Sequence, residues 1–186
     1  MTDRKAAALL AAAVILAATF RFSGLGFYND DYALLAALAR GSFTTEFAGL
    51  FYTRPLDIPF FSGLFAAFGT TPWPYHLLSR LLDLAVAWLF YRWLRGEGAD
   101  APTALLAALF TALYPNHDAA RCWPSGLVAQ GGLTGTLFAL VLFRTGRRAA
   151  GSVVFLAAML FYEAPSLLFA AVPFAAWLRE KDFKKA

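Results

Sequence analysis

Long apolar runs separated by short polar segments dominate the chain. A helix that crosses a hydrocarbon core of about 30 Å needs about 20 residues, and fewer when one end lines a polar cavity. The pattern predicts six transmembrane helices, at about 6–22, 73–94, 102–115, 125–143, 149–163 and 165–178. The first run follows Arg4 and Lys5 and could imitate a signal peptide. Because its small-residue cleavage site is unconvincing and more apolar runs follow, we interpret it as an uncleaved helix.

One further apolar run, 56–68, is assigned by charge rather than by hydropathy. If it does not cross, most of the 16 Lys and Arg residues fall on one side, in the N-terminal segment, two loops and the C-terminal segment. Short basic loops favour the cytoplasm, so both termini are expected there. An outer loop, 23–72, then carries two surface helices, 30–39 and 56–68. The predicted fold is an all-α polytopic membrane helix bundle, forming a single domain over 1–186.

Composition agrees with a bilayer environment. Hydrophobic residues make up 60% of the chain, charged residues 15%, and the mean hydropathy is +0.57. The net charge of +4 could suggest nucleic acid, but the basic residues cluster between apolar runs, as topology signals do. We therefore expect membrane lipid as a partner, no nucleic acid, and location in the cell (inner or plasma) membrane. The single cysteine, Cys122, excludes an internal disulfide framework, and the spacing of the two histidines argues against a zinc site.

The predicted topology places one group of polar residues outside or in the outer half of the membrane, namely Asp30, Asp31, Glu46, Asp57, His117, Asp118 and Glu163. Glu163 interrupts an apolar stretch whose two ends are both basic, so the stretch must be a hairpin that turns at this residue. A carboxylate at membrane depth is costly, and its default interpretation is functional. The alternatives are a structural ion pair, for instance with Arg121, or a protonated acid that caps a helix end.

Two adjacent acids, Asp30 and Asp31, open the first surface helix. They can simply complement the helix dipole after the N-cap candidate Asn29. Alternatively, one serves as a general base while its neighbour orients a helix or binds a cation. Adjacent helical residues point about 100° apart, so both are not expected to face one small ligand equally.

Arginines and a turn supply further candidate binding groups. Arg54 starts the second surface helix and can clamp a phosphate or carboxylate, or else contact lipid headgroups. Arg80 can bind substrate or pair with Asp83, three residues on. His117 and Asp118 are either polar groups of a cavity or solvated turn residues. The chain has no Walker sequence, dinucleotide-binding loop or nucleophile elbow.

Several short motifs resemble, in order, the membrane-embedded GT-C type glycosyltransferases, including the protein O-mannosyltransferase-like and aminoarabinose transferase-like groups. They are Tyr28-Asn29-Asp30-Asp31-Tyr32, Arg54-Pro55-Leu56 with the following Phe68-Gly69 and 72–76, Pro115-Asn116-His117 with Trp123 and Ser125-Gly126, and Tyr162-Glu163 with Pro173. Relatives often carry an acid two residues after the histidine, where this chain has Ala119. Because family members usually continue through more helices, the chain resembles an N-terminal half.

The resemblance implies transfer of a sugar from a polyprenyl-phosphate donor to an acceptor glycan, lipid or protein outside the cytoplasm, with inversion. Asp30 and Asp31 would be catalytic, and Asp30 would be the base. Substrate binding would fall to Arg54, Arg80, His117, Asp118, Arg121 and Glu163. The cofactor stays unknown, and Asp30 and Asp31 allow a divalent cation.

Two other interpretations stay open. The chain could be a non-catalytic scaffold, transport or lipid-binding component, because broken helices and intramembrane acids also suit transporters. Against a transporter, no inverted repeat is apparent between the halves and the acids collect at one face. The chain could also be an inactive fragment of a transferase.

Overall fold

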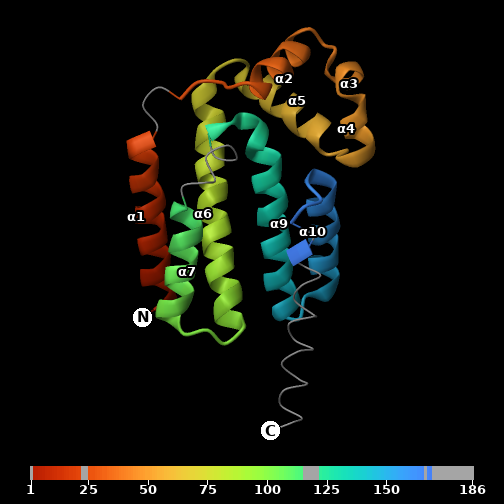
Figure 1. The fold of residues 1–186 in the computed structure, drawn as a ribbon. Helices are drawn as coiled ribbons and strands as arrows, with labels where there is room; N and C mark the ends of the chain where they lie inside the picture. Colours follow the sequence, from red (N-terminus) through yellow and green to blue (C-terminus); the bar gives the residue numbers. More distant parts are fainter. Residues whose placement is uncertain (1, 22–24, 115–121, 166, 169–186) are drawn as a thin grey trace.

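The computed structural model describes residues 2–21, 25–114, 122–165 and 167–168. Every regular element in these ranges is helical, which confirms the all-α class (Figure 1). The elements are α1 (Asp3–Arg21), α2 (Asp30–Ala39), α3 (Phe43–Glu46), α4 (Ala48–Thr53), α5 (Asp57–Phe68), α6 (Pro72–Gly96), α7 (Ala101–Leu113), η2 (Pro124–Gly126), α9 (Leu127–Arg144) and α10 (Arg148–Phe161).

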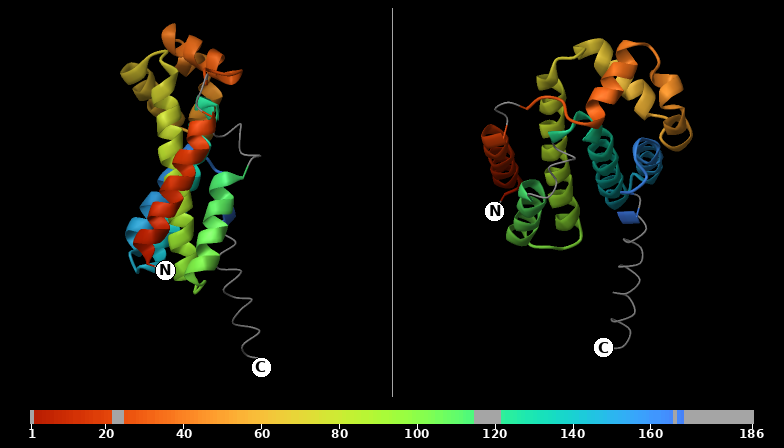
Figure 2. Two further views of the ribbon diagram at one scale, coloured as in Figure 1. Left: turned by 90° about the vertical axis from the view of Figure 1, so that its left-hand side faces the viewer. Right: turned by 45° about the horizontal axis from the view of Figure 1, so that its top comes forward.

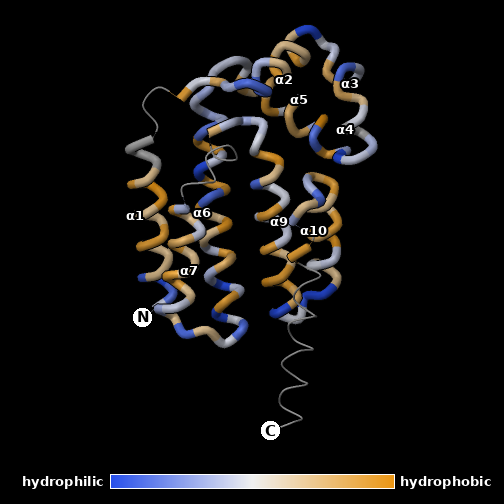
Figure 3. The backbone as a smooth tube through the Cα atoms, in the orientation of Figure 1, coloured by the Kyte–Doolittle hydropathy of each residue, from blue (hydrophilic) through white to orange (hydrophobic). Residues whose placement is uncertain are grey.

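Five long helices run side by side in the spatial order α1, α7, α6, α9, α10 (Figure 1). Their direction alternates along the chain, so the spatial neighbours α1 and α7 are parallel, as are α6 and α9. The start of α1 and the connections α6–α7 and α9–α10 lie at one end of the bundle (Figure 1). At that end Arg144 Nη2 donates to the carbonyl oxygen of Gly96, and Arg144 Nε lies 3.5 Å from the Glu97 carboxylate. The backbone coloured by hydropathy is hydrophilic at these connections and largely hydrophobic along the helices that they join (Figure 3).

The short helices α2 to α5 lie together across the opposite end, above α9 and α10, in all views (Figures 1 and 2). We call this group the end unit, residues 30–68. Gly41 and Gly69 end α2 and α5 with φ of 69° and 54°, a conformation that glycine adopts without a Cβ penalty. A buried aromatic and aliphatic cluster, which includes Phe43 and Phe61, joins the end unit to Tyr75 of α6 and Leu127 of α9.

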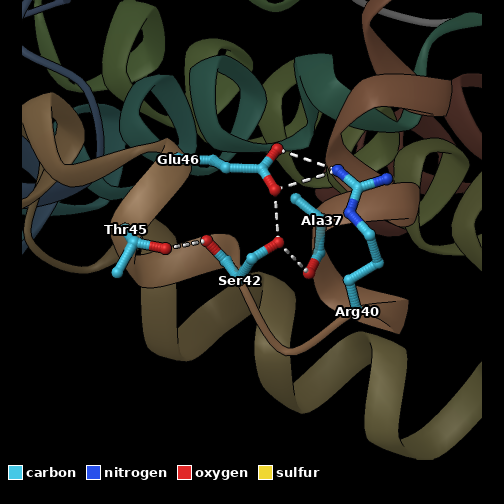
Figure 4. Close-up of polar contacts among 5 residues, drawn as sticks. All are labelled: Ala37, Arg40, Ser42, Thr45 and Glu46. Atoms are coloured by element: carbon cyan, nitrogen blue, oxygen red, sulfur yellow. Dashed lines mark hydrogen bonds and ion pairs between the residues drawn. The ribbon is translucent and has the colours of Figure 1, made fainter.

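The turn between α2 and α3 is held by exposed polar contacts (Figure 4). Arg40 Nη2 donates to both carboxylate oxygens of Glu46 at 2.9 Å. The Ser42 hydroxyl donates to the same carboxylate, and Thr45 Oγ1 donates to the Ser42 carbonyl oxygen at 2.8 Å. Glu46, one of the outer acids and the last residue of α3, is thus engaged by Arg40 and Ser42.

Helices α9 and α10 approach each other closely through small residues. A Cβ built on Gly135 would lie 2.8 Å from Ala158 Cβ, and one on Gly132 would lie 2.8 Å from Tyr162 Cβ. Real Cβ contacts are essentially never that short. Glycines in this register let helix backbones pack at a distance that larger residues forbid, as in membrane helix pairs.

One helix within the described ranges, Pro124–Arg144, is by itself long and apolar enough to cross a membrane, with a mean hydropathy of 1.7 and half of the apolar window buried in the protein. Asp57–Phe68, Ala101–Leu113 and Arg148–Phe161 are shorter apolar helices. The predicted span 165–178 lies almost wholly outside the described residues. The six-span arrangement therefore stays a prediction.

Candidate functional site: a cavity under the end unit

A cavity of about 450 Å³ lies where the end unit meets α9 and α10. Its walls come from segments far apart in the chain, namely α2, the α3–α4 junction, the start of α5, the η2–α9 segment and the residue after α10. Polar groups on the wall are few and aromatic rings are several. The cavity lining includes the charged residues Asp30, Arg54 and Asp57 and the aromatic residues Phe61, Trp123 and Tyr162.

The two adjacent acids of α2 take different positions. Asp30 is exposed and lines the cavity. Asp31 is 1% exposed, and its carboxylate accepts hydrogen bonds from the backbone N–H groups of Tyr28, at 2.9 Å, and Ser125, at 2.7 Å. Asn29 makes no side-chain capping bond. Asp31 therefore ties the start of α2 to the start of the α9 segment, while Asp30 is the one of the pair that faces a ligand space.

The segment before α2 is anchored on α6. His76 is 1% exposed, and its Nε2 atom lies 3.0 Å from the Gly26 carbonyl oxygen. Phe27 packs edge-on against Tyr75, with ring centroids 5.6 Å apart, and the Tyr75 hydroxyl donates to the Gly69 carbonyl oxygen at 2.8 Å. These contacts fix the direction from which the chain enters α2, and hence the position of Asp30.

Arg54 and Glu163, both predicted to bind substrate, form a bidentate ion pair. Arg54 Nε donates to Glu163 Oε2 and Nη2 donates to Oε1, both at 2.8 Å. The guanidinium carbon also lies 4.2 Å from the centroid of the Tyr162 ring. The hydrogen bonds to Glu163 raise the pKa of Arg54 above its usual value. The sequence allowed an ion pair for Glu163, for instance with Arg121. The structure shows such an ion pair, but with Arg54.

The Glu163 side chain is 54% exposed rather than enclosed. The pair joins the end unit to the end of α10, with help from two neighbouring contacts. Leu56 N–H donates to the Leu160 carbonyl oxygen at 3.3 Å, and Phe60 packs edge-on against Phe161 at 5.2 Å. One wall of the cavity is thereby closed.

Asp57 is the buried acid of the site. It is 2% exposed, it lines the cavity, and its Oδ1 atom is enclosed with no hydrogen-bond partner within the described part of the chain. Burial raises the pKa of Asp57 to about 7; the positive charge of Arg54 acts against this rise, and the negative charge of Glu163 adds to it. At neutral pH this carboxyl is therefore part protonated, and can donate as well as accept.

Arg80 lies away from the cavity lining. Its Nη1 atom donates to Asp83 Oδ2 at 2.8 Å, as the spacing of three allowed. Gln130 of α9 donates to the other carboxylate oxygen at 3.1 Å, so the pair lies at the contact between α6 and α9. This confirms the predicted pairing with Asp83, while the predicted role of Arg80 in substrate binding stays a prediction.

The remaining predicted residues cannot be placed in the same way. His117, Asp118 and Arg121 lie outside the described residues. Among the residues that are described, no group of three or more His, Cys, Asp or Glu side chains could hold a metal ion. A divalent cation on Asp30 and Asp31 stays a prediction.

The predicted topology places Asp57 on the outer side, but its sequence context did not mark it as a site residue. The one feature of the sequence that could have indicated a site residue is that Asp57 is an isolated acid in the apolar segment 56–68. An acid in the first turn of a helix is equally well explained by its favourable interaction with the helix dipole. Trp123 and Tyr162 were noted as motif members, and the structure adds that both line the cavity.

Comparison with known proteins gives no match to a protein-family model, to a curated protein or to a solved structure.

Proposed function

We propose that the chain is a multi-pass protein of the cell membrane. Large apolar side chains point outward from several of the long helices, with Leu16 of α1 60% exposed, Phe110 of α7 66% and Leu156 of α10 60%. Outward apolar faces on successive helices suit a lipid environment better than water. The basic ends of these helices lie together at the end opposite the end unit, which agrees with the positive-inside rule.

We further propose that the cavity is a glycosyl-transfer site that takes a polyprenyl-phosphate sugar as donor and an acceptor glycan, lipid or protein. This proposal is supported by one observation, that residues from separate sequence motifs line the same cavity. Asp30, Arg54, Trp123 and Tyr162 belong to four separate motifs of the resemblance, and all four line one cavity. Its position at the outer end of the bundle would let a lipid tail lie along the helices while the head group enters the cavity.

In the proposed reaction the acceptor hydroxyl oxygen attacks the anomeric carbon and the bond from that carbon to the phosphate oxygen breaks. The Asp30 carboxylate takes the acceptor proton, and the electron pair leaves with the phosphate. Inversion follows from the single displacement. Arg54 would stabilise the departing phosphate, where negative charge develops.

The ion pair adds a condition to this mechanism. Because Glu163 occupies the planar edge of the Arg54 guanidinium, a phosphate must displace this carboxylate or bind the remaining N–H groups. In the first case Glu163 is released to accept hydrogen bonds from the sugar. His117, Asp118, Arg80 and Arg121 remain proposed contributors to substrate binding.

The test is transfer of a radiolabelled sugar from short-chain polyprenyl-phosphate sugars by the chain reconstituted in lipid vesicles. Asp30→Asn is expected to abolish transfer without changing membrane insertion, whereas Glu46→Gln, an acid-to-amide change on the exposed α2–α3 turn, is expected to retain it. Full activity of Asp30→Asn would refute the assignment. Binding of the labelled donor by the wild-type chain without any transfer would instead favour the scaffold or inactive-fragment interpretation.

A further inference from the structure

Asp57 combines properties that are unusual for a buried acid. It is enclosed, it lies on the cavity wall, and its Oδ1 atom has no hydrogen-bond partner within the described ranges. Buried polar side-chain atoms normally find a partner, because an unsatisfied one costs free energy that folding must offset. An apolar residue of similar size would avoid this cost, so a carboxyl here is better explained by an interaction made when the cavity is filled.

The surroundings of Asp57 restrict which chemistry could satisfy it. Phe61 and Trp123 contribute apolar ring surface to the same cavity, and Asp30 lies on its wall. A sugar ring combines both needs, since its C–H faces pack on aromatic rings and its edge carries hydroxyl groups. A ligand ammonium group is less favourable at this point, because Arg54 already places a positive charge in the same turn.

We propose that Asp57 binds a hydroxyl group of the sugar through its Oδ1 atom and so positions the sugar ring in the cavity under the end unit. The proposal deepens, and rests on, the proposed glycosyl-transfer function. A protonated carboxyl can donate to one sugar oxygen and accept from another, and an ionised one can still accept. Asp57 is in this sense a positioning residue, distinct from Asp30, which takes the proton.

The test compares two probes that differ only in the sugar, namely a short-chain polyprenyl-phosphate monosaccharide and the same polyprenyl phosphate without sugar. Binding of each to the reconstituted chain is measured at pH 6 for wild type, Asp57→Leu and Asp57→Asn. Asp57→Leu is expected to weaken binding of the sugar-bearing probe about tenfold, which corresponds to about 1.4 kcal/mol, and to leave the sugar-free probe unchanged. Asp57→Asn, which keeps an acceptor and a donor, is expected to restore most of the affinity.

Thermal unfolding of Asp57→Leu checks that the fold is intact, because removal of a buried carboxyl without a partner should leave the melting temperature equal or higher. Equal binding of the sugar-bearing probe by wild type and Asp57→Leu would overturn the inference while leaving the proposed function standing. Equal weakening of both probes would also overturn it, since Asp57 would then act on the fold or the lipid rather than on the sugar. Failure of the wild-type chain to bind either probe would overturn both proposals together.

Discussion

Asp31 and Asp30 offer a sharp test, because two neighbouring identical residues have opposite structural roles. We predict that Asp31→Ala destabilises the chain strongly and that Asp30→Ala does not. The Asp31 carboxylate accepts from two backbone N–H groups, of Tyr28 at 2.9 Å and of Ser125 at 2.7 Å, in a position that is 1% exposed. Asp30 is exposed to the cavity.

The magnitude follows from these two bonds. A hydrogen bond to a charged group contributes about 1.5–3 kcal/mol, and its loss leaves a donor without a partner. Loss of both should cost about 3–6 kcal/mol. Since 1 kcal/mol shifts the melting temperature of a chain of this size by about 2–4 °C, we expect a decrease of about 10 °C. Asp30→Ala removes only an exposed charge from a first helical turn, and should change stability by less than about 1 kcal/mol.

The assay is thermal unfolding in detergent micelles, followed by far-ultraviolet circular dichroism and tryptophan fluorescence. Trp123 lies two residues before Ser125, so in a background that keeps it as the only one of the five tryptophans its emission should report detachment of this segment from α2. The interpretation of Asp31 as a tie would be refuted if Asp31→Ala melted within about 2 °C of wild type. It would equally fail if Asp30→Ala lost as much stability as Asp31→Ala.

Three further predictions address the buried acid, the close helix contact and the sidedness of the fold. The pKa of Asp57 is raised from 3.8 to about 7, so the unfolded chain loses this proton first. Stability should therefore fall by roughly 4 kcal/mol between about pH 4 and pH 7, and level off above. Asp57→Asn should remove most of that fall, and unchanged pH dependence of its melting temperature would refute the assignment. Gly135→Ala should destabilise the chain by about 1–3 kcal/mol, because the added Cβ has no room against α10. The control Gly131→Ala, whose added Cβ would have no neighbour closer than 3.8 Å, should be neutral or stabilising. Equal melting temperatures of the two variants would contradict this packing. With the native cysteine replaced by serine, a cysteine at Thr44 should react with a membrane-impermeant maleimide on intact cells, and one at Ala149 only after permeabilisation; labelling of both from outside would contradict the proposed topology.

The helices themselves were largely predictable. The ranges predicted for the surface helices, 30–39 and 56–68, correspond to α2 and α5 within one residue, and the long apolar runs correspond to α1, α6, α7, α9 and α10. Helical periodicity and apolar length are local properties, so they can be read from consecutive residues. The short helices α3 and α4 carried no such pattern and were missed.

The candidate site was only partly predictable. Arg54 and Glu163 were each selected from their local context, but their pairing joins positions 109 residues apart and depends on how the end unit sits on α10. Asp57 was expected only to lie on the outer side, because nothing in neighbouring residues reveals that its carboxyl is enclosed.

The sequence by itself determined an all-helical chain, the positions of its main helices and the clustering of basic residues in the segments that join them. These follow from composition and from the 3.6-residue period, which act along the chain. Only the tertiary structure decided which of the two adjacent acids faces the cavity, which arginine meets Glu163, and that Asp57 Oδ1 is buried with no hydrogen-bond partner among the described residues. Such properties depend on side chains brought together from distant segments, because burial and ion pairing are set by the surroundings in space.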